Sequence, residues 1–85
     1  MKTFTHVIQD PMGLHARPAG LLAKAASAYP CQITVTTSAG TADAKRLMSV
    51  MRLAAKAGME LTVSCDGERE EEAAAGMEVF LKETL

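Results

Sequence analysis

The sequence is poor in aromatic residues and carries almost no net charge. Its 85 residues include no tryptophan, one tyrosine and two phenylalanines, and the basic and acidic residues nearly balance to give a net charge of −1. No cluster of lysine or arginine dominates the chain, which argues against nucleic acid or an anionic membrane as the default partner. Any electrostatic recognition must therefore be local.

Long apolar runs and paired cysteine motifs are also missing. The chain starts Met1-Lys2-Thr3 and continues in alternation rather than in a continuous apolar stretch. Neither a signal peptide nor a membrane span is expected, and we predict a cytoplasmic protein. Cys31 and Cys65 lie far apart without C-x-x-C spacing, so they are expected to be buried thiols in a reducing compartment rather than a disulfide frame or zinc site. No metal or cofactor site is expected.

Apolar periodicity divides the chain into four short strands and three helices. A chain of 85 residues is expected to form one domain, residues 1–85, with a modest core. Alternation predicts strands and three-to-four spacing predicts helices, the strands over residues 3–9, 31–36, 41–44 and 59–65 and the helices over residues 16–28, 45–53 and 68–84. One-faced strands need helices over their apolar side, which predicts a two-layer α+β domain. Periodicity leaves the order of the strands open.

The segment Gly13-Leu14-His15-Ala16-Arg17-Pro18-Ala19 places a histidine where a helix should begin. Gly13 can adopt the backbone angles of a tight turn, and Pro18 is tolerated in a helix only in its first turn. An anion at this point would meet the free N–H groups of Ala16 and Arg17, the positive end of the helix dipole and the Arg17 guanidinium. The segment therefore predicts a phosphate-binding site beside the His15 imidazole.

This motif, together with the chain length, the element order and residues 45–51, resembles the HPr family, the histidine phosphocarriers of the bacterial phosphoenolpyruvate-dependent sugar phosphotransferase system. The resemblance implies an open-faced sandwich: a four-stranded antiparallel sheet in the order 1-4-2-3 with three helices on one face. It implies that His15 accepts a phosphoryl group on Nδ1 from phospho-enzyme I and that Arg17 binds the phosphate. Sugar-specific IIA components would then receive the group, so the protein would be a carrier rather than an autonomous enzyme.

A partner surface is expected over the starts of the first two helices. Short apolar helices with flanking basic residues fit recognition of an acidic protein surface. The residues expected to contact partners are Arg17, Gly20, Lys24, Lys45, Arg46, Leu47, Met48 and Met51. Met48 and Met51 could equally be core residues, because methionine serves both roles.

One position departs from the family pattern. In many Gram-positive relatives a serine follows a lysine at the start of the second helix and is phosphorylated by an ATP-dependent kinase, whereas here Arg46 follows Lys45. Arginine cannot accept that phosphate, and it replaces a switchable negative charge with a fixed positive one. Ser49 lies three residues further on, and the regulatory role is not transferred to it.

Two other classes of function stay open. An HPr-fold regulatory adaptor would bind partners without carrying phosphate, which the presence of His15 disfavours. A small nucleic-acid-binding α+β module is disfavoured by the few aromatics and the near-neutral charge.

Three further residues are given structural roles. His6 faces inward in the first strand without neighbouring ligands and is expected to be structural. The strand order implied by the resemblance places Cys31 and Cys65 on neighbouring strands. Both thiols are expected to face the core and to be reduced.

Overall fold

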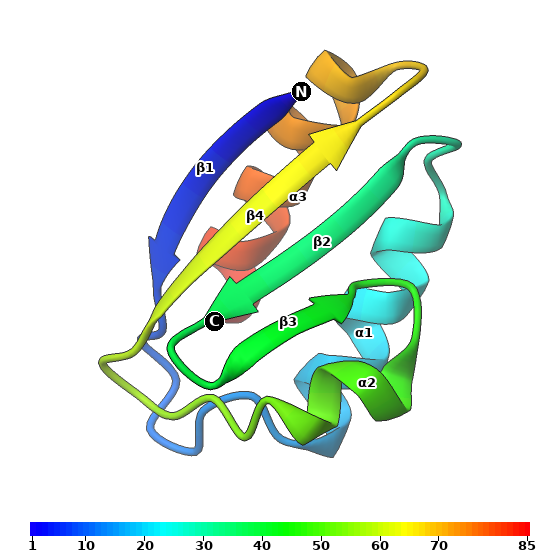
Figure 1. The fold of residues 1–85 in the computed structure, drawn as a ribbon. Coiled ribbons are helices and arrows are strands. Elements are labelled where there is room, and N and C mark those ends of the chain that lie inside the picture. The colour runs from blue at the N-terminus through cyan, green and yellow to red at the C-terminus, as the bar shows by residue number, and fades with distance from the viewer.

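Four strands form a single antiparallel sheet in the order β1-β4-β2-β3 in a computed structural model that describes residues 1–85 (Figure 1). This confirms the fold and the strand order that the family resemblance implies. The elements run β1 (Lys2–Val7), α1 (Ala16–Ser27), β2 (Gln32–Thr37), β3 (Gly40–Asp43), α2 (Leu47–Arg52), β4 (Glu60–Asp66) and α3 (Glu70–Thr84).

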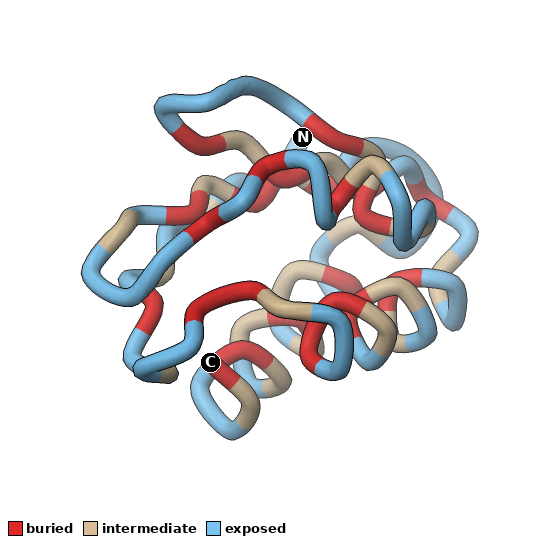
Figure 2. The backbone as a smooth tube through the Cα atoms, turned by 90° about the horizontal axis from the view of Figure 1, so that it is seen from below, coloured by how far each residue is buried: buried red, intermediate tan, exposed pale blue.

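Alternation along the central strands places their apolar side chains on the face that the helices cover. In β4, Leu61, Val63 and Cys65 are fully buried, and the register pairs Val35 of β2 with Val63 and Ile33 of β2 with Cys65. Figure 2 shows the strands and helices as two layers with buried residues in both. The core lies between these layers, because residues two apart on a strand point to the same face.

The opposite face of the sheet is polar. Hydroxyl groups from neighbouring strands meet there, with Thr3 and Ser64 3.4 Å apart and Thr36 and Thr41 3.2 Å apart. Such cross-strand pairs suit a solvated face. The molecule therefore buries one side of its sheet and leaves the other open.

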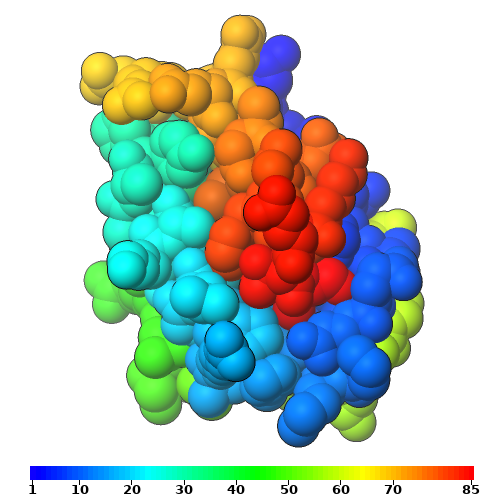
Figure 3. Space-filling view, turned by 180° about the vertical axis from the view of Figure 1, so that it is seen from behind, coloured from blue at the N-terminus to red at the C-terminus, as the bar shows by residue number.

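Helices α1 and α3 lie side by side over the sheet (Figure 3). Their inward stripes consist of small and medium-sized residues at helical spacing: Ala19, Leu22 and Ala26 in α1, and Ala73, Met77 and Leu81 in α3. As predicted, α3 is the longest helix, with 15 residues. Small residues let the helices approach the sheet closely, as expected for a chain with few aromatics.

Two helices begin later than the sequence predicts. The second was expected from residue 45, but Asp43 Oδ1 accepts a hydrogen bond from the Lys45 N–H group at 2.9 Å and Arg46 is extended, so α2 begins at Leu47. The third was expected from residue 68, but Arg69 adopts a left-handed conformation with φ 62°, so α3 begins at Glu70. In both cases local turn geometry overrides apolar periodicity.

Strand ends are displaced by one or two residues from the predicted ones. The first strand ends at Val7 rather than at residue 9, and β2 and β4 each begin and end one residue later than expected. Cys31 therefore precedes β2 instead of opening it. Hydrogen bonding to the neighbouring strand sets these ends. The alternation of apolar residues within one segment contains no information about that pairing.

Both cysteines are free and buried, on the helix-covered side as predicted. Burial, followed by the charges of the neighbouring Cys31 and Glu70, raises the pKa of the Cys65 thiol to about 11. Because the thiolate is the reactive form, Cys65 is a poor nucleophile in the folded protein. No helix combines the length and apolar character that crossing a membrane requires.

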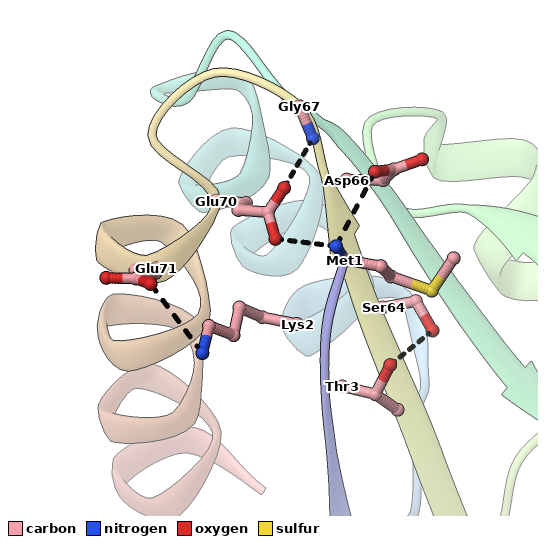
Figure 4. A network of polar contacts seen from close by, with 8 residues as sticks. All are labelled: Met1, Lys2, Thr3, Ser64, Asp66, Gly67, Glu70 and Glu71. Carbon is pink, nitrogen blue, oxygen red and sulfur yellow. Dashed lines mark hydrogen bonds and ion pairs between the residues drawn. The ribbon is translucent and has the colours of Figure 1, made fainter.

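A polar network ties the start of β1 to the turn before α3 (Figure 4). Glu70 accepts a hydrogen bond from the Gly67 N–H group at 3.2 Å and lies 2.7 Å from the Met1 amino group. Lys2 and Glu71 form a longer ion pair of 3.6 Å. These contacts lie at the opposite end of β1 from the His15 loop.

Candidate functional site

The loop between β1 and α1 is built on Asp10. Its side-chain Oδ1 accepts a hydrogen bond from the Met12 N–H group at 2.9 Å, and its main-chain oxygen accepts one from the Gly13 N–H group at 2.9 Å. Gly13 has φ 68°, in the left-handed region that favours glycine. Together these contacts turn the chain sharply just before His15.

Gly13 also lies directly against the connection between α2 and β4. A Cβ atom on Gly13 would overlap the main-chain oxygen of Ala55 and lie 2.8 Å from the Lys56 Cα atom. The next residue, Leu14, donates its N–H group to the Ala55 oxygen at 2.8 Å and is buried. The loop therefore has no room for a side chain at residue 13, two residues before His15.

His15 is the N-cap residue of α1, as the sequence predicts. Its backbone is extended, and its main-chain oxygen accepts the first helical hydrogen bond, from the Ala19 N–H group at 2.9 Å. Its side chain makes no capping hydrogen bond, and the N–H groups of Ala16 and Arg17 have no acceptor within the protein. Pro18 contributes no N–H group at a position where a helix cannot use one. Two main-chain donors and the positive helix end thus lie beside the imidazole.

Arg17 completes a shallow depression at this helix start. Its side chain is exposed and forms no ion pair within the protein, which leaves all its guanidinium donors free. The depression has a volume of about 330 Å³ and is lined by Asp10, His15, Arg17, Pro18, Leu21, Glu83 and Thr84. An arginine can bind two phosphate oxygens at once. The structure therefore brings His15, the predicted phosphoryl acceptor, together with Ala16 and Arg17, the two residues predicted to bind phosphate.

Three contributors to this region were not found from the sequence. Asp10 Oδ2 lies 4.0 Å from His15 Nε2, and Glu83 and Thr84 reach the depression from the end of α3. The main-chain oxygen of Leu85 accepts hydrogen bonds from the N–H groups of Gln9 and Asp10. Figure 3 shows the red end of the chain against the blue segment before α1. The Asp-Pro-Met-Gly turn could have indicated Asp10, but no local signal places residues 83–85 beside His15.

The expected partner residues fall into two groups. Exposed side chains are found at Arg17, Lys24, Arg46, Leu47, Met48 and Met51. A Cβ atom on Gly20 would meet no atom within 4 Å, so this part of α1 is open. Lys45 differs, because its Nζ atom donates to the Tyr29 main-chain oxygen at 2.7 Å and joins α2's start to the end of α1.

The structure also shows where the α2 methionines lie. Met48 is 66% and Met51 37% exposed, whereas Val50 is the buried residue of this helix. Of the two readings left open by the sequence, core or surface, the structure therefore supports surface. Arg46 is exposed, and its Nε atom lies 3.7 Å from Asp43 Oδ2. The position corresponding to the family's regulatory serine therefore carries a positive charge in one long, exposed ion pair.

His6 lies on the inward side of β1, opposite Leu61 of β4. Its Nε2 atom is buried and has no hydrogen-bond partner. No group of three or more metal-ligating side chains is present in the molecule. His15 is therefore the one histidine that combines an accessible ring with an anion-binding environment.

Comparison with protein families gives a match over nearly the whole chain. The family model for the PTS HPr component phosphorylation site matches residues 2–83. The chain is also similar to the phosphocarrier protein HPr of Mycoplasma capricolum, with 41% identity over 73 residues, which cover 86% of this chain and 82% of the relative.

Solved structures agree with this similarity. A histidine-containing phosphocarrier protein from a study of Mycoplasma superposes with a TM-score of 0.94 at 36% identity, covering 98% of this chain and 94% of the other. An HPr from Thermoanaerobacter tengcongensis gives a TM-score of 0.92 at 34% identity, covering 99% and 94% of the two chains.

Proposed function

Because this chain belongs to the HPr family of phosphotransferase-system phosphocarriers, we propose that His15 accepts a phosphoryl group from phospho-enzyme I and passes it to sugar-specific IIA components. The observation that supports this most directly is the placement of His15 at the start of α1, beside two unpaired main-chain donors and the unpaired Arg17. The resemblance to the family assigns the phosphoryl group to Nδ1.

The site suits a group that is held briefly. A ring nitrogen of a neutral imidazole can attack phosphorus, and phosphoryl transfer then requires mainly positioning and neutralisation of charge. A phosphate carrying roughly −1.5 to −2 charges would meet the N–H groups of Ala16 and Arg17 and the Arg17 side chain. Helix-end contacts of this kind contribute about 0.3–2 kcal/mol. They orient the phosphate and still allow it to leave.

Partners would dock over α1 and α2, where the exposed apolar residues lie next to the site. Leu47, Met48 and Met51 supply apolar contacts, and Arg17, Lys24 and Arg46 supply positive charge around them. Apolar centres with charged rims are typical of transient protein interfaces, in which the rim charges mainly govern the association rate. Enzyme I and the IIA components are therefore expected to present acidic surfaces.

Incubation with enzyme I and phosphoenolpyruvate, followed by intact-mass measurement, tests the acceptor assignment. We expect one phosphoryl group that is lost in acid, and no phosphoryl group on His15→Ala. The control is His6→Leu, which replaces the other imidazole at an inward position with an apolar side chain and should be phosphorylated like the wild type. A folded wild-type protein that binds enzyme I but gains no phosphate would instead support the adaptor function.

A further inference from the structure

Asp10 holds its carboxylate rigidly beside the His15 ring. Its main-chain N–H group donates to the Leu85 oxygen at 3.0 Å, and its main-chain oxygen accepts from Gly13 at 2.9 Å. Its Oδ1 atom accepts from the Met12 N–H group at 2.9 Å. With these three contacts in place, the remaining Oδ2 atom points to His15 Nε2 at 4.0 Å. The Asp10 side chain is 27% exposed, so the pair is partly shielded from water.

This arrangement distinguishes the two nitrogens of the imidazole. A neutral imidazole carries its proton on one nitrogen and a lone pair on the other, and the neighbouring groups select between them. A carboxylate accepts hydrogen bonds and does not donate them, so it favours the proton on the nitrogen that faces it. Asp10 Oδ2 faces Nε2, so the carboxylate favours the form of the ring that has its proton on Nε2 and its lone pair on Nδ1.

We propose that Asp10 is a positioning residue for phosphoryl transfer: it keeps a proton on His15 Nε2, so that Nδ1 is the nucleophile and later the leaving atom. This inference deepens the proposed function and rests on it. Asp10 acts through His15 and does not itself contact the phosphoryl group.

The transfer balances without net movement of a proton. The Nδ1 lone pair forms a bond to phosphorus while the bond from phosphorus to the donor atom of phospho-enzyme I breaks, and that electron pair returns to the donor atom. The phosphorylated ring, still protonated on Nε2, is then positively charged and faces the Asp10 carboxylate. When an acceptor attacks phosphorus, the Nδ1–P electron pair returns to Nδ1 and a neutral imidazole leaves. Without the Nε2 proton the leaving group would be an imidazolate, which is a much poorer one.

The other charged groups around the ring leave this role to Asp10. Arg17 from α1 and Glu83 from α3 line the same depression. Arg17 carries only donors and cannot accept the ring proton, and among the carboxylates only Asp10 comes within 4.0 Å of a His15 ring nitrogen. The 4.0 Å separation is longer than a hydrogen bond, and it can shorten when the ring gains positive charge on phosphorylation. The contact is thus weak before the reaction and stronger in the phosphorylated form.

Asp10→Asn changes the contact of Oδ2 with His15 and keeps the contact of Oδ1 with Met12. Asparagine retains an Oδ1 acceptor for the Met12 N–H group, but it presents a donor amide to Nε2 in place of Oδ2. The matched control is Asp43→Asn, because Asp43 Oδ1 likewise accepts from the N–H group two residues on, at 2.9 Å, and its Oδ2 faces Arg46 rather than His15. Asp10→Ser, which keeps a side-chain acceptor without charge, is a second variant should the asparagine protein fail to fold.

Two measurements test the proposal. Nitrogen-15 shifts of the unphosphorylated ring at alkaline pH should show the Nε2–H form in the wild type and in Asp43→Asn, and an increased Nδ1–H form in Asp10→Asn. After phosphorylation with enzyme I and phosphoenolpyruvate, the phosphoryl group of Asp10→Asn should hydrolyse about three- to fivefold more slowly near neutral pH, the factor that corresponds to an opposite charge at 4 Å in water. Its pH–rate profile should move to lower pH.

The outcomes separate the two proposals. If wild-type protein gains no phosphate, the proposed function fails, while the ring shifts still test Asp10. If Asp10→Asn and Asp10→Ser show the same ring shifts and the same hydrolysis profile as Asp43→Asn, the positioning role is wrong.

Discussion

Gly13 is the residue on which the geometry of the His15 loop depends most. It combines a φ of 68° with contact against Ala55 and Lys56 that leaves no space for a Cβ atom. We expect Gly13→Ala to lower the free energy of unfolding by about 1–3 kcal/mol, since both the backbone angle and the contact are unfavourable for alanine. Urea denaturation measures this change.

Gly20→Ala is the matched control for that substitution. Gly20 lies within α1, and a Cβ atom added there would meet nothing within 4 Å. Gly20→Ala should therefore raise the free energy of unfolding by about 0.5–1 kcal/mol, because alanine has the higher helix propensity. Equal effects of the two substitutions would show that the contact with Ala55 does not constrain the loop.

Residues of the site differ in how far they could be predicted from the sequence. His15, Arg17 and the free Ala16 N–H group follow from a local pattern, because turn, cap and proline preferences act within a few residues. Asp10 contacts His15 across a turn that the sequence signals, but its direction depends on the Leu85 contact. Glu83 is brought to the site only by packing of α3, which no local pattern encodes.

At the scale of elements, α2 is a six-residue helix that buries only Val50. Its stability comes from packing rather than from its own length, because so short a helix is unstable in isolation. Its remaining apolar residues, Leu47, Met48 and Met51, are exposed. The buried residue that anchors α2 and the exposed residues proposed to dock partners are therefore different, and they can be changed independently.

We expect Met48→Ser to weaken binding to enzyme I by about tenfold, which is the effect of losing a moderate interface contact. Because Met48 is 66% exposed, the substitution should change the free energy of unfolding of the protein by no more than about 0.5 kcal/mol. Calorimetric titration measures the first effect and urea denaturation the second.

Val50→Ala is the counterpart in the same helix. It should lower stability by about 1–3 kcal/mol, because it removes two methyl groups from a fully buried site. At temperatures where Val50→Ala stays folded, its affinity for enzyme I should be close to that of the wild type.

The Met48→Ser variant decides the location of the docking surface. If Met48→Ser binds enzyme I as tightly as the wild type does, the docking surface does not include this part of α2.

Element types were predicted more reliably than element ends. Periodicity identifies which side of a segment is apolar, and this was sufficient for all four strands and three helices. The starts of α2 and α3 depend instead on the Asp43 turn and on the left-handed Arg69. A side chain that caps a turn and one that begins a helix look alike in a sequence.

At the scale of the whole molecule, acidic residues near the start of α3 make stability depend on pH. The Met1 amino group, followed by the Gly67 N–H group, holds the pKa of Glu70 below its ordinary value of 4.5. Arg69, through paired hydrogen bonds of 2.8 and 2.7 Å, likewise lowers the pKa of Glu72. A carboxyl whose pKa is lower in the folded state stabilises the fold above its ordinary pKa, and this contribution is lost as pH falls through the folded value.

We therefore expect stability to be nearly constant from neutral pH down to about pH 5 and to decrease below it. Glu70→Gln should make this acid decrease shallower, because it removes one of the groups that must be protonated. Glu78→Gln is the control, since Glu78 makes no ion pair or side-chain hydrogen bond. Urea midpoints measured across the acid range give the slope of stability against pH. Identical slopes in the wild type, Glu70→Gln and Glu78→Gln would exclude a role for Glu70.

Strand order is the feature of the whole molecule that the residues alone did not determine. Alternation assigns a face to each strand but not a neighbour, and the order 1-4-2-3 came from the resemblance to the HPr family. The structure confirms this order through its pairing register. Neighbours depend on contacts between segments far apart in the chain, which local periodicity does not contain.

The hydrogen bonds that fix the His15 loop join distant parts of the chain, Leu14 to Ala55 and Asp10 to Leu85. During translation, residues 9 and 10 are made early, but their acceptor at residue 85 is made more than seventy residues later. At synthesis rates of about 5–20 residues per second, several seconds separate the two. A nascent chain that has not yet reached residue 85 thus contains the histidine without the Leu85 contacts of its loop.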